Sequence, residues 1–147
     1  MRVSAKGEYA LQALLDLARH DTEGLRPIQE IAARQGIPQR YLEQVLLQLK
    51  RAGFLDSRRG SAGGYRLARP AAEVTVGAVL RAVEGPVAGA EPRRGGRHGH
   101  GDYRGDLADL WRGVADAVSA VVDGVTIDDL RRRAEDRRAG AQPMYHI

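Results

Sequence analysis

Two arginines stand directly before a run of glycines in the segment RRGSAGG, which spans Arg58 to Gly64. Guanidinium groups pair with phosphate oxygens, and glycine permits positive φ angles and a close backbone approach. Alternating apolar and polar residues flank the segment, from Leu55 to Ser57 and from Tyr65 to Leu67. This alternation predicts a β-hairpin whose basic turn can approach an anionic backbone closely.

A second group of chemically active side chains lies on the helix predicted before this hairpin. At 100° per residue, its inner face holds Leu42, Val45, Leu46, Leu49 and Gly53. The opposite face is cationic and amide-bearing and holds Arg40, Gln44, Leu47 and Arg51. An amphipathic helix followed by a basic hairpin is typical of a winged helix-turn-helix. There the helix enters the major groove, and the hairpin, or wing, contacts the DNA backbone or minor groove.

Three more helices are predicted around this pair. They begin after Ser4, at Pro27 and after Thr75, and they end near Arg19, at Gly36 and at Glu84. The Gly36 turn joins two helices at close spacing, as in a helix-turn-helix. We therefore predict a mainly α fold with a small β-hairpin wing, in which residues 1–86 form the winged helix-turn-helix domain.

Residues 87–105 contain six glycines, four arginines and almost no large apolar side chains, which predicts a flexible or partner-ordered loop. His98 and His100 form an H-x-H pair in it, and imidazoles bind zinc, copper or nickel. Two ligands are too few for a closed site, and the nearby arginines repel a cation. A solvated loop without metal is therefore favoured, and a metal-responsive loop is the alternative.

A long apolar stripe follows on a helix predicted from Asp106 to Asp123. It includes Leu107, Leu110, Trp111, Val114, Val118, Val121 and Val122. The winged domain alone cannot cover a stripe of this length, so we predict a dimerisation helix that packs on a second copy. Packing on its own domain is the alternative. Thr126 and Asp129 predict a capping box for a last helix to about Arg138, so that 106–138 is helical and 139–147 is a tail.

Charge and composition narrow the functional classes. Residues 1–70 carry 12 Lys and Arg against 7 Asp and Glu, whereas residues 106–147 carry 6 against 8. The positive charge thus lies on the half with the predicted DNA-binding elements. There are no cysteines, no secretion signal and no apolar run long enough to span a membrane. We expect a cytoplasmic protein without membrane association.

The motifs KGEYALQALLDLA, IAARQGIP, YLEQVLLQLKRAGFLDSRRGSAGGYRLARP and VGAVLRAVEGP resemble the Rrf-two family of bacterial winged-helix transcription regulators. The resemblance covers roughly residues 2 to 86. It implies a homodimer that binds double-stranded DNA at a partly palindromic operator, most simply as a repressor. It also implies that the later helix is the dimerisation helix.

The resemblance assigns roles to individual residues. It implies base reading by Gln39, Arg40, Glu43 and Gln44. It implies phosphate contacts from Lys6, Tyr41 and Arg58, and it places Arg59 in the minor groove beside the wing glycines Gly60, Gly63 and Gly64. Structural alternatives remain: Glu43 could pair with Arg40 or Lys50, and Tyr41 could be packed in the core.

Many relatives hold a redox-sensing iron–sulfur cluster through three cysteines in the loop before the dimerisation helix. The corresponding loop here, VAGAEPRRGGRHGHGDYRG, has none. The chain therefore departs from that pattern, and we expect no cofactor.

The chain ends in Met144, Tyr145, His146 and Ile147. This ending is similar to the C-terminal peptide by which serine acetyltransferase enters cysteine synthase. The cysteine-metabolism repressor, which also lacks a cluster, uses that enzyme as a co-regulator. The similarity implies cysteine synthase as a partner and a role in cysteine metabolism, and an inert tail is the alternative.

Two other functional classes are alternatives to a DNA-binding regulator. A winged-helix module for protein–protein contacts would keep the fold without binding DNA. An enzyme is disfavoured because no paired carboxylates, nucleophile set or phosphate loop of known spacing occurs, and RGSAGG lacks the Lys-Ser/Thr of a P-loop.

Overall fold

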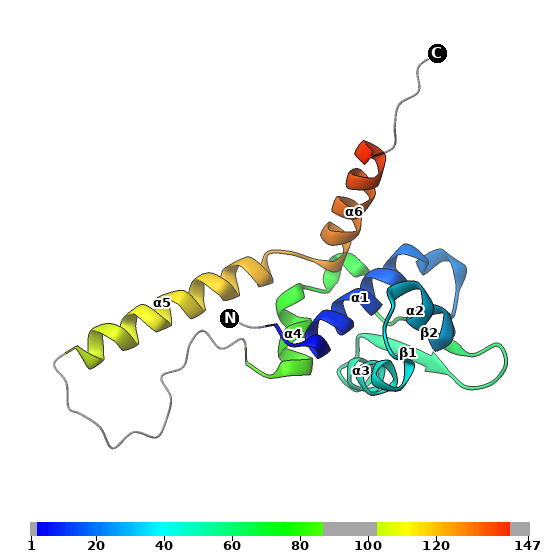
Figure 1. Ribbon diagram of the computed structural model, residues 1–147, viewed down its shortest axis with the longest axis horizontal. Coiled ribbons are helices and arrows are strands. Elements are labelled where there is room, and N and C mark those ends of the chain that lie inside the picture. The colour runs from blue at the N-terminus through cyan, green and yellow to red at the C-terminus, as the bar shows by residue number, and fades with distance from the viewer. Residues whose placement is uncertain (1–2, 87–102, 142–147) are drawn as a thin grey trace, which may run out of the picture.

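A computed structural model describes residues 3–86 and 103–141, and Figure 1 shows the arrangement. The elements are α1 (Ala5–Arg19), η1 (Asp21–Glu23), α2 (Ile28–Gln35), α3 (Gln39–Arg51), β1 (Leu55–Arg58), β2 (Gly64–Leu67), η2 (Ala71–Glu73), α4 (Val76–Glu84), α5 (Arg104–Asp123) and α6 (Ile127–Ala141). The mainly α class with a β-hairpin is confirmed. Helices α1 to α4 and the hairpin form one body, from which α5 extends to one side and α6 to another. No helix among the described residues is long and apolar enough to cross a membrane.

The helix ends follow the predicted capping residues. Ser4 Oγ accepts a hydrogen bond from Gly7 N at 3.3 Å, and Thr75 Oγ1 accepts one from Ala78 N at 3.1 Å. Thr126 and Asp129 form the reciprocal bonds of a capping box, at 2.9 and 3.0 Å. These predicted caps are confirmed. They were predictable because each depends only on contacts between residues three positions apart in the chain.

Some boundaries differ from the prediction. Helix α3 ends at Arg51, so the placement of Gly53 on its inner face is wrong: Gly53 lies exposed in the following turn with φ +85°. Helix α5 begins at Arg104 rather than Asp106, and α6 continues to Ala141. The predictions for His98, His100 and most of the 87–105 loop lie outside the described residues, as do those for 142–147.

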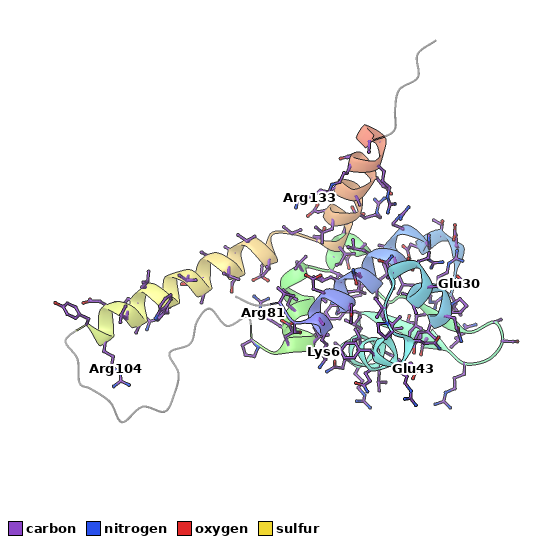
Figure 2. The ribbon with its side chains drawn as sticks, in the orientation of Figure 1. Lys6, Glu30, Glu43, Arg81, Arg104 and Arg133 are labelled. Carbon is purple, nitrogen blue, oxygen red and sulfur yellow. The ribbon has the colours of Figure 1, made fainter. Side chains whose placement is uncertain are left out.

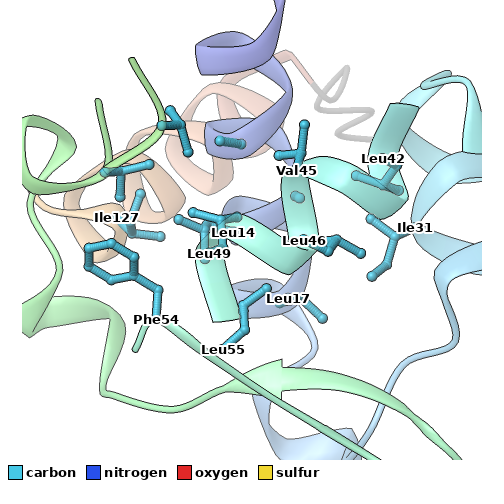
Figure 3. Packing of buried hydrophobic residues seen from close by; sticks show 14 of the residues in the cluster. Leu14, Leu17, Ile31, Leu42, Val45, Leu46, Leu49, Phe54, Leu55 and Ile127 are labelled. Atoms are coloured by element: carbon cyan, nitrogen blue, oxygen red, sulfur yellow. The ribbon is translucent and has the colours of Figure 1, made fainter. Parts of the chain in front are cut away.

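The core lies where α1, α2, α3 and β1 meet (Figure 3). Fully buried members include Leu14 of α1, Ile31 of α2 and Leu46 and Leu49 of α3. Burying one such side chain contributes about 1.5–3 kcal/mol. Ile127 joins this core from the start of α6, so the C-terminal helices are tied to the winged domain there.

A buried ion pair joins α1 to α2. The Asp16 carboxylate is only 3% exposed and accepts hydrogen bonds from Arg34 Nε at 2.8 Å, Arg34 Nη2 at 2.7 Å and Gln35 Nε2 at 3.1 Å. Burial raises the pKa of Asp16, but the hydrogen bonds from Arg34 and Gln35 outweigh burial and hold that pKa below its usual range. The pair therefore sets the angle between the first two helices.

A second joint fixes the C-terminal end of α5 beside α4. Val76 N donates to Val125 O at 2.9 Å, and Arg81 donates two hydrogen bonds to Asp123 at 2.6 and 2.8 Å. A Cβ added at Gly77 would overlap the Asp123 carboxylate, so this glycine leaves the space that the carboxylate occupies.

The rest of α5 buries no residue among the described parts of the chain. Leu107 is 51% exposed, Leu110 54% and Val121 67%. Trp111 and Val114 are also exposed, while Val118 and Val122 are half-buried. The alternative that this stripe packs on its own domain is therefore wrong for the residues described.

Replacing Asp16 by Asn should lower the free energy of unfolding by about 2 kcal/mol, because Arg34 would lose its charged partner. The value is smaller than for a fully buried pair, since Arg34 is one-third exposed. Because the pKa of Asp16 is lowered in the fold, its contribution is complete above about pH 4 and is lost as the pH falls through the lowered pKa. Denaturant unfolding from pH 7 to pH 3 measures this.

The matched control is Asp109→Asn, which breaks the exposed pair with Arg112 at 3.2 Å. It should change stability by less than about 0.5 kcal/mol. Equal losses in the two variants at pH 7 would contradict the role assigned to Asp16.

Candidate nucleic-acid interface

Helix α3 presents a continuous polar face on one side of the winged domain. Its inner side is closed by Leu42, Val45, Leu46 and Leu49, which are all buried. Its outer side exposes Gln39, Arg40, Tyr41, Glu43, Gln44, Leu47, Lys50 and Arg51. The predicted division between a buried face and an exposed, mainly polar face is confirmed. The packed core holds the helix so that its outer row of side chains is available to a ligand.

The wing turn owes its shape to its glycines. Strand pairing runs from Leu55↔Leu67 to Arg58↔Gly64, which leaves Arg59 to Gly63 as the turn. Gly60 has φ +108°, a region that disfavours side chains, and a Cβ at Gly63 would overlap the Arg58 carbonyl oxygen. The tight turn brings the exposed Arg58 and Arg59 to the tip of the hairpin.

A feature that sequence reasoning missed attaches the wing to the segment before α2. Arg26 N donates to Tyr65 O and Tyr65 N donates to Arg26 O, both at 2.8 Å. At the neighbouring Gly64, with φ +149°, a Cβ would overlap the Arg26 carbonyl oxygen. The Arg26 side chain also pairs with Glu23 and, at 3.5 Å, with Glu30. The hairpin is therefore fixed relative to α2 and α3.

An open hollow of about 610 Å³ lies between the wing, α3 and the start of α2. Leu47 and Lys50 line it from α3. Its wing side is lined by Ser57, Arg58, Arg59, Gly60, Ser61, Gly63, Gly64 and Tyr65. The structure thus brings all five predicted wing residues together with the C-terminal half of α3. Lys50 and Ser61 were not predicted there, although the exposed position of Lys50 on the helix was a usable signal.

A second, more apolar hollow of about 440 Å³ lies on the other side of α3, beside α1. It is lined by Ala5, Tyr9, Pro38, Arg40, Tyr41 and Gln44. The Tyr9 and Tyr41 rings meet edge to face, with centroids 5.4 Å apart. Tyr41 is 37% exposed, so it packs on Tyr9 and also faces outward. The base-reading and phosphate-contacting candidates therefore flank α3 on both sides.

The start of α1 faces the same side of the molecule. Figure 2 shows Lys6 and Glu43 projecting from the same edge, away from Arg133. Glu84, the last residue of α4, accepts a hydrogen bond from Ser4 N at 2.8 Å and another from Ser4 Oγ. A Cβ at Gly7 would overlap this carboxylate. The position of Lys6 is thus coupled to the end of α4.

The positive charges on this face favour the binding of an anion. Among the described residues, no carboxylate lies within ion-pair distance of Arg40, Lys50, Arg51, Arg58 or Arg59. The suggested pairing of Glu43 with Arg40 or Lys50 is absent there too. By contrast, Arg34 and Arg81, away from this face, each hold a carboxylate. The unneutralised cations flank the grooves on both sides of α3.

Comparison with known proteins identifies this arrangement. A family model described as "Rrf2: Iron-dependent Transcriptional regulator" matches residues 3–133. The chain belongs to the Rrf2 family. It is 40% identical over 136 residues to the HTH-type transcriptional regulator IscR of Pectobacterium carotovorum, covering 92% of this chain and 82% of that protein. The relation confirms the Rrf-two resemblance, and the family is one of transcriptional regulators rather than enzymes.

Solved structures agree with this assignment. The structure of CymR, the global cysteine regulator of B. subtilis, superposes with a TM-score of 0.78 at 32% identity, covering 90% of this chain and 98% of CymR. IscR of T. potens superposes with a TM-score of 0.76 at 33% identity, covering 99% and 97%. The chain is thus a winged-helix DNA-binding regulator of the Rrf2 family.

The iron in the family description does not fit the donors present. Iron–sulfur clusters in proteins are held mainly by cysteine thiolates, and this chain has no cysteine. Within residues 3–86 and 103–141, no three His, Asp or Glu side chains gather closely enough to hold a metal ion. The side chains present therefore do not match the cysteine ligand set of an iron–sulfur cluster.

Proposed function

We propose that this Rrf2 regulator is a cytoplasmic homodimeric repressor that binds a partly palindromic operator without an iron–sulfur cluster. The observation that carries the proposal is the row of cations along α3 and the wing that pair with no carboxylate of residues 3–86 and 103–141. The Arg26–Tyr65 bridge holds the wing and α3 at a fixed spacing. Phosphate contacts by such cations supply much of the affinity for DNA, and base contacts supply the specificity.

The roles of individual residues follow from their positions. We propose that Gln39, Arg40, Glu43 and Gln44 read base edges in the major groove, since they lie in the exposed N-terminal half of α3. Lys6 and Tyr41 contact phosphates on the α1 side of that helix. Arg58 contacts phosphates on the wing side, and Arg59 enters the minor groove. Gly60, Gly63 and Gly64 support the wing that carries both arginines.

The exposed stripe of α5 supports the homodimer. Five large apolar side chains of α5 are each at least one-third exposed: Leu107, Leu110, Trp111, Val114 and Val121. Leaving so many apolar side chains of one helix in contact with water is unfavourable. Packing against the same helix of a second copy would bury them together with Val118 and Val122. Two winged domains would then face one side of a duplex, about one helical turn apart.

Arg59→Ala should weaken binding to a fragment of the regulated promoter about tenfold at physiological salt. It should also lower the slope of log affinity against log salt by about one, because a minor-groove cation close to the phosphates is lost and releases no counterion. Fluorescence anisotropy at several salt concentrations measures both. Arg138→Ala removes the same charge from α6 and should change neither; unchanged binding by Arg59→Ala would contradict the role of the wing.

Leu110→Lys should convert the dimer to a monomer and reduce operator affinity about a hundredfold, since two linked half-sites bind far more tightly than one. Light scattering and anisotropy on the same sample test this. Asp116→Lys is the matched control, because Asp116 lies on the opposite side of α5 and should leave the dimer intact. A dimeric Leu110→Lys variant would rule out the α5 seam.

We also propose a role in cysteine metabolism, with cysteine synthase as the partner of residues Met144 to Ile147. Two similarities support it: the peptide resemblance noted above, and the structural likeness to CymR, a global cysteine regulator. Removing Met144 to Ile147 should abolish co-purification with cysteine synthase and leave DNA binding unchanged. Equal capture by the full and shortened chains would end this part of the proposal.

A further inference from the structure

Leu47 is an apolar side chain in the middle of the polar face of α3. It is 44% exposed and takes no part in the hydrophobic core, which Leu42, Val45, Leu46 and Leu49 already complete. Contact with water does not stabilise a leucine side chain at this position. Its neighbours on the outer face, such as Gln44 and Lys50, are charged or amide-bearing. A single exposed leucine is ordinary on many surfaces, but this one lies inside the DNA-binding face.

The neighbours of Leu47 determine what can cover it. Lys50 lies beside it on α3, and Arg58 and Arg59 face it across the hollow below the wing. These cations have no carboxylate partner among the described residues. These cations therefore favour a partner in which anionic groups surround a small apolar group. A protein surface of ordinary composition does not offer this combination. A DNA duplex does, because it surrounds base edges with phosphates.

The position of Leu47 along the helix places it within reach of base edges. It lies three residues after Gln44 and four after Glu43, so the three side chains share one side of the helix. Helical side chains lean toward the N-terminus, so Leu47 leans back toward this pair. The rise of about 4.5 Å from Gln44 to Leu47 is comparable to the roughly 3.4 Å between stacked base pairs.

We propose that Leu47 is a specificity-determining residue that packs on the C5-methyl group of a thymine in each half-site. The thymine methyl is the apolar group that the major groove displays, and no other base carries one there. Arg40, Glu43 and Gln44 read hydrogen-bonding edges, whereas Leu47 reads the methyl group beside them. The inference rests on the proposed binding face, and it adds a contact that discriminates thymine from cytosine at one position.

The test replaces the methyl group alone. The full chain first selects its preferred duplex from a randomised library, and each thymine of the enriched half-site is then replaced in turn by deoxyuridine. One replacement in each half-site should weaken binding by the wild-type chain about fifteenfold, because two buried methyl groups are lost and each is worth about fourfold. Leu47→Ala should bind the thymine and deoxyuridine duplexes equally, and Leu47→Met should retain most of the difference.

Gln44→Ala is the matched control from the same helix face. It should weaken binding overall and keep the ratio between the thymine and deoxyuridine duplexes. The inference is overturned if the enriched half-site contains no thymine, if the wild-type chain ignores every methyl removal, or if Leu47→Ala keeps the ratio. The first two of these outcomes are measured on the wild-type chain alone, so they do not depend on whether the variants fold. A chain that enriches no sequence would overturn the proposed operator binding as well.

Discussion

The backbone bridge between Arg26 and Tyr65 is the constraint on which the DNA-binding face depends. A two-stranded hairpin alone is marginally stable in water, and here β2 gains a second backbone neighbour, the segment just before α2. The absence of a side chain at Gly64 makes the bridge sterically feasible. Because α2 packs on α3 through the core, the wing turn is held at a set distance from the outer face of α3. The hollow between the wing and α3 follows from this arrangement.

The remaining polar contacts fall into two groups. One group lies within α1 to α4 and the hairpin, here called the head, and the other holds α5, here called the arm. The pair between Asp16 and Arg34 stiffens the head by joining α1 to α2, and Glu84 ties the end of α4 to the start of α1. The arm, α5, is held at one end by Arg81, Asp123 and the strand-like bonds around Val76. Most of its apolar stripe is left exposed by the described residues, with only Val118 and Val122 half-buried.

Local rules explain most of what could be predicted from the sequence. Caps at Ser4 and Thr75, the glycine turn of the wing and the two faces of α3 each depend on residues a few positions apart, so periodicity and turn chemistry suffice. The predicted position of Gly53 on the inner face of α3 is wrong because a helical period can be continued past Arg51, where the helix ends. The period does not show that Gly53 has a positive φ. The Arg26 bridge was missed because it joins distant segments through backbone atoms, which leave no pattern in side-chain types. The stripe on α5 could be predicted from its spacing, and its length indicated that the winged domain alone would not cover it.

The joint at Gly77 has a geometric consequence for the arm. A helix of 20 residues is about 30 Å long, so a tilt of about 10° where α5 meets α4 displaces its far end by about 5 Å. That distance exceeds the rise of one base pair, roughly 3.4 Å. A change at the contact between Arg81 and Asp123 that tilted α5 by this angle would therefore move the far end of α5 by more than one base-pair step.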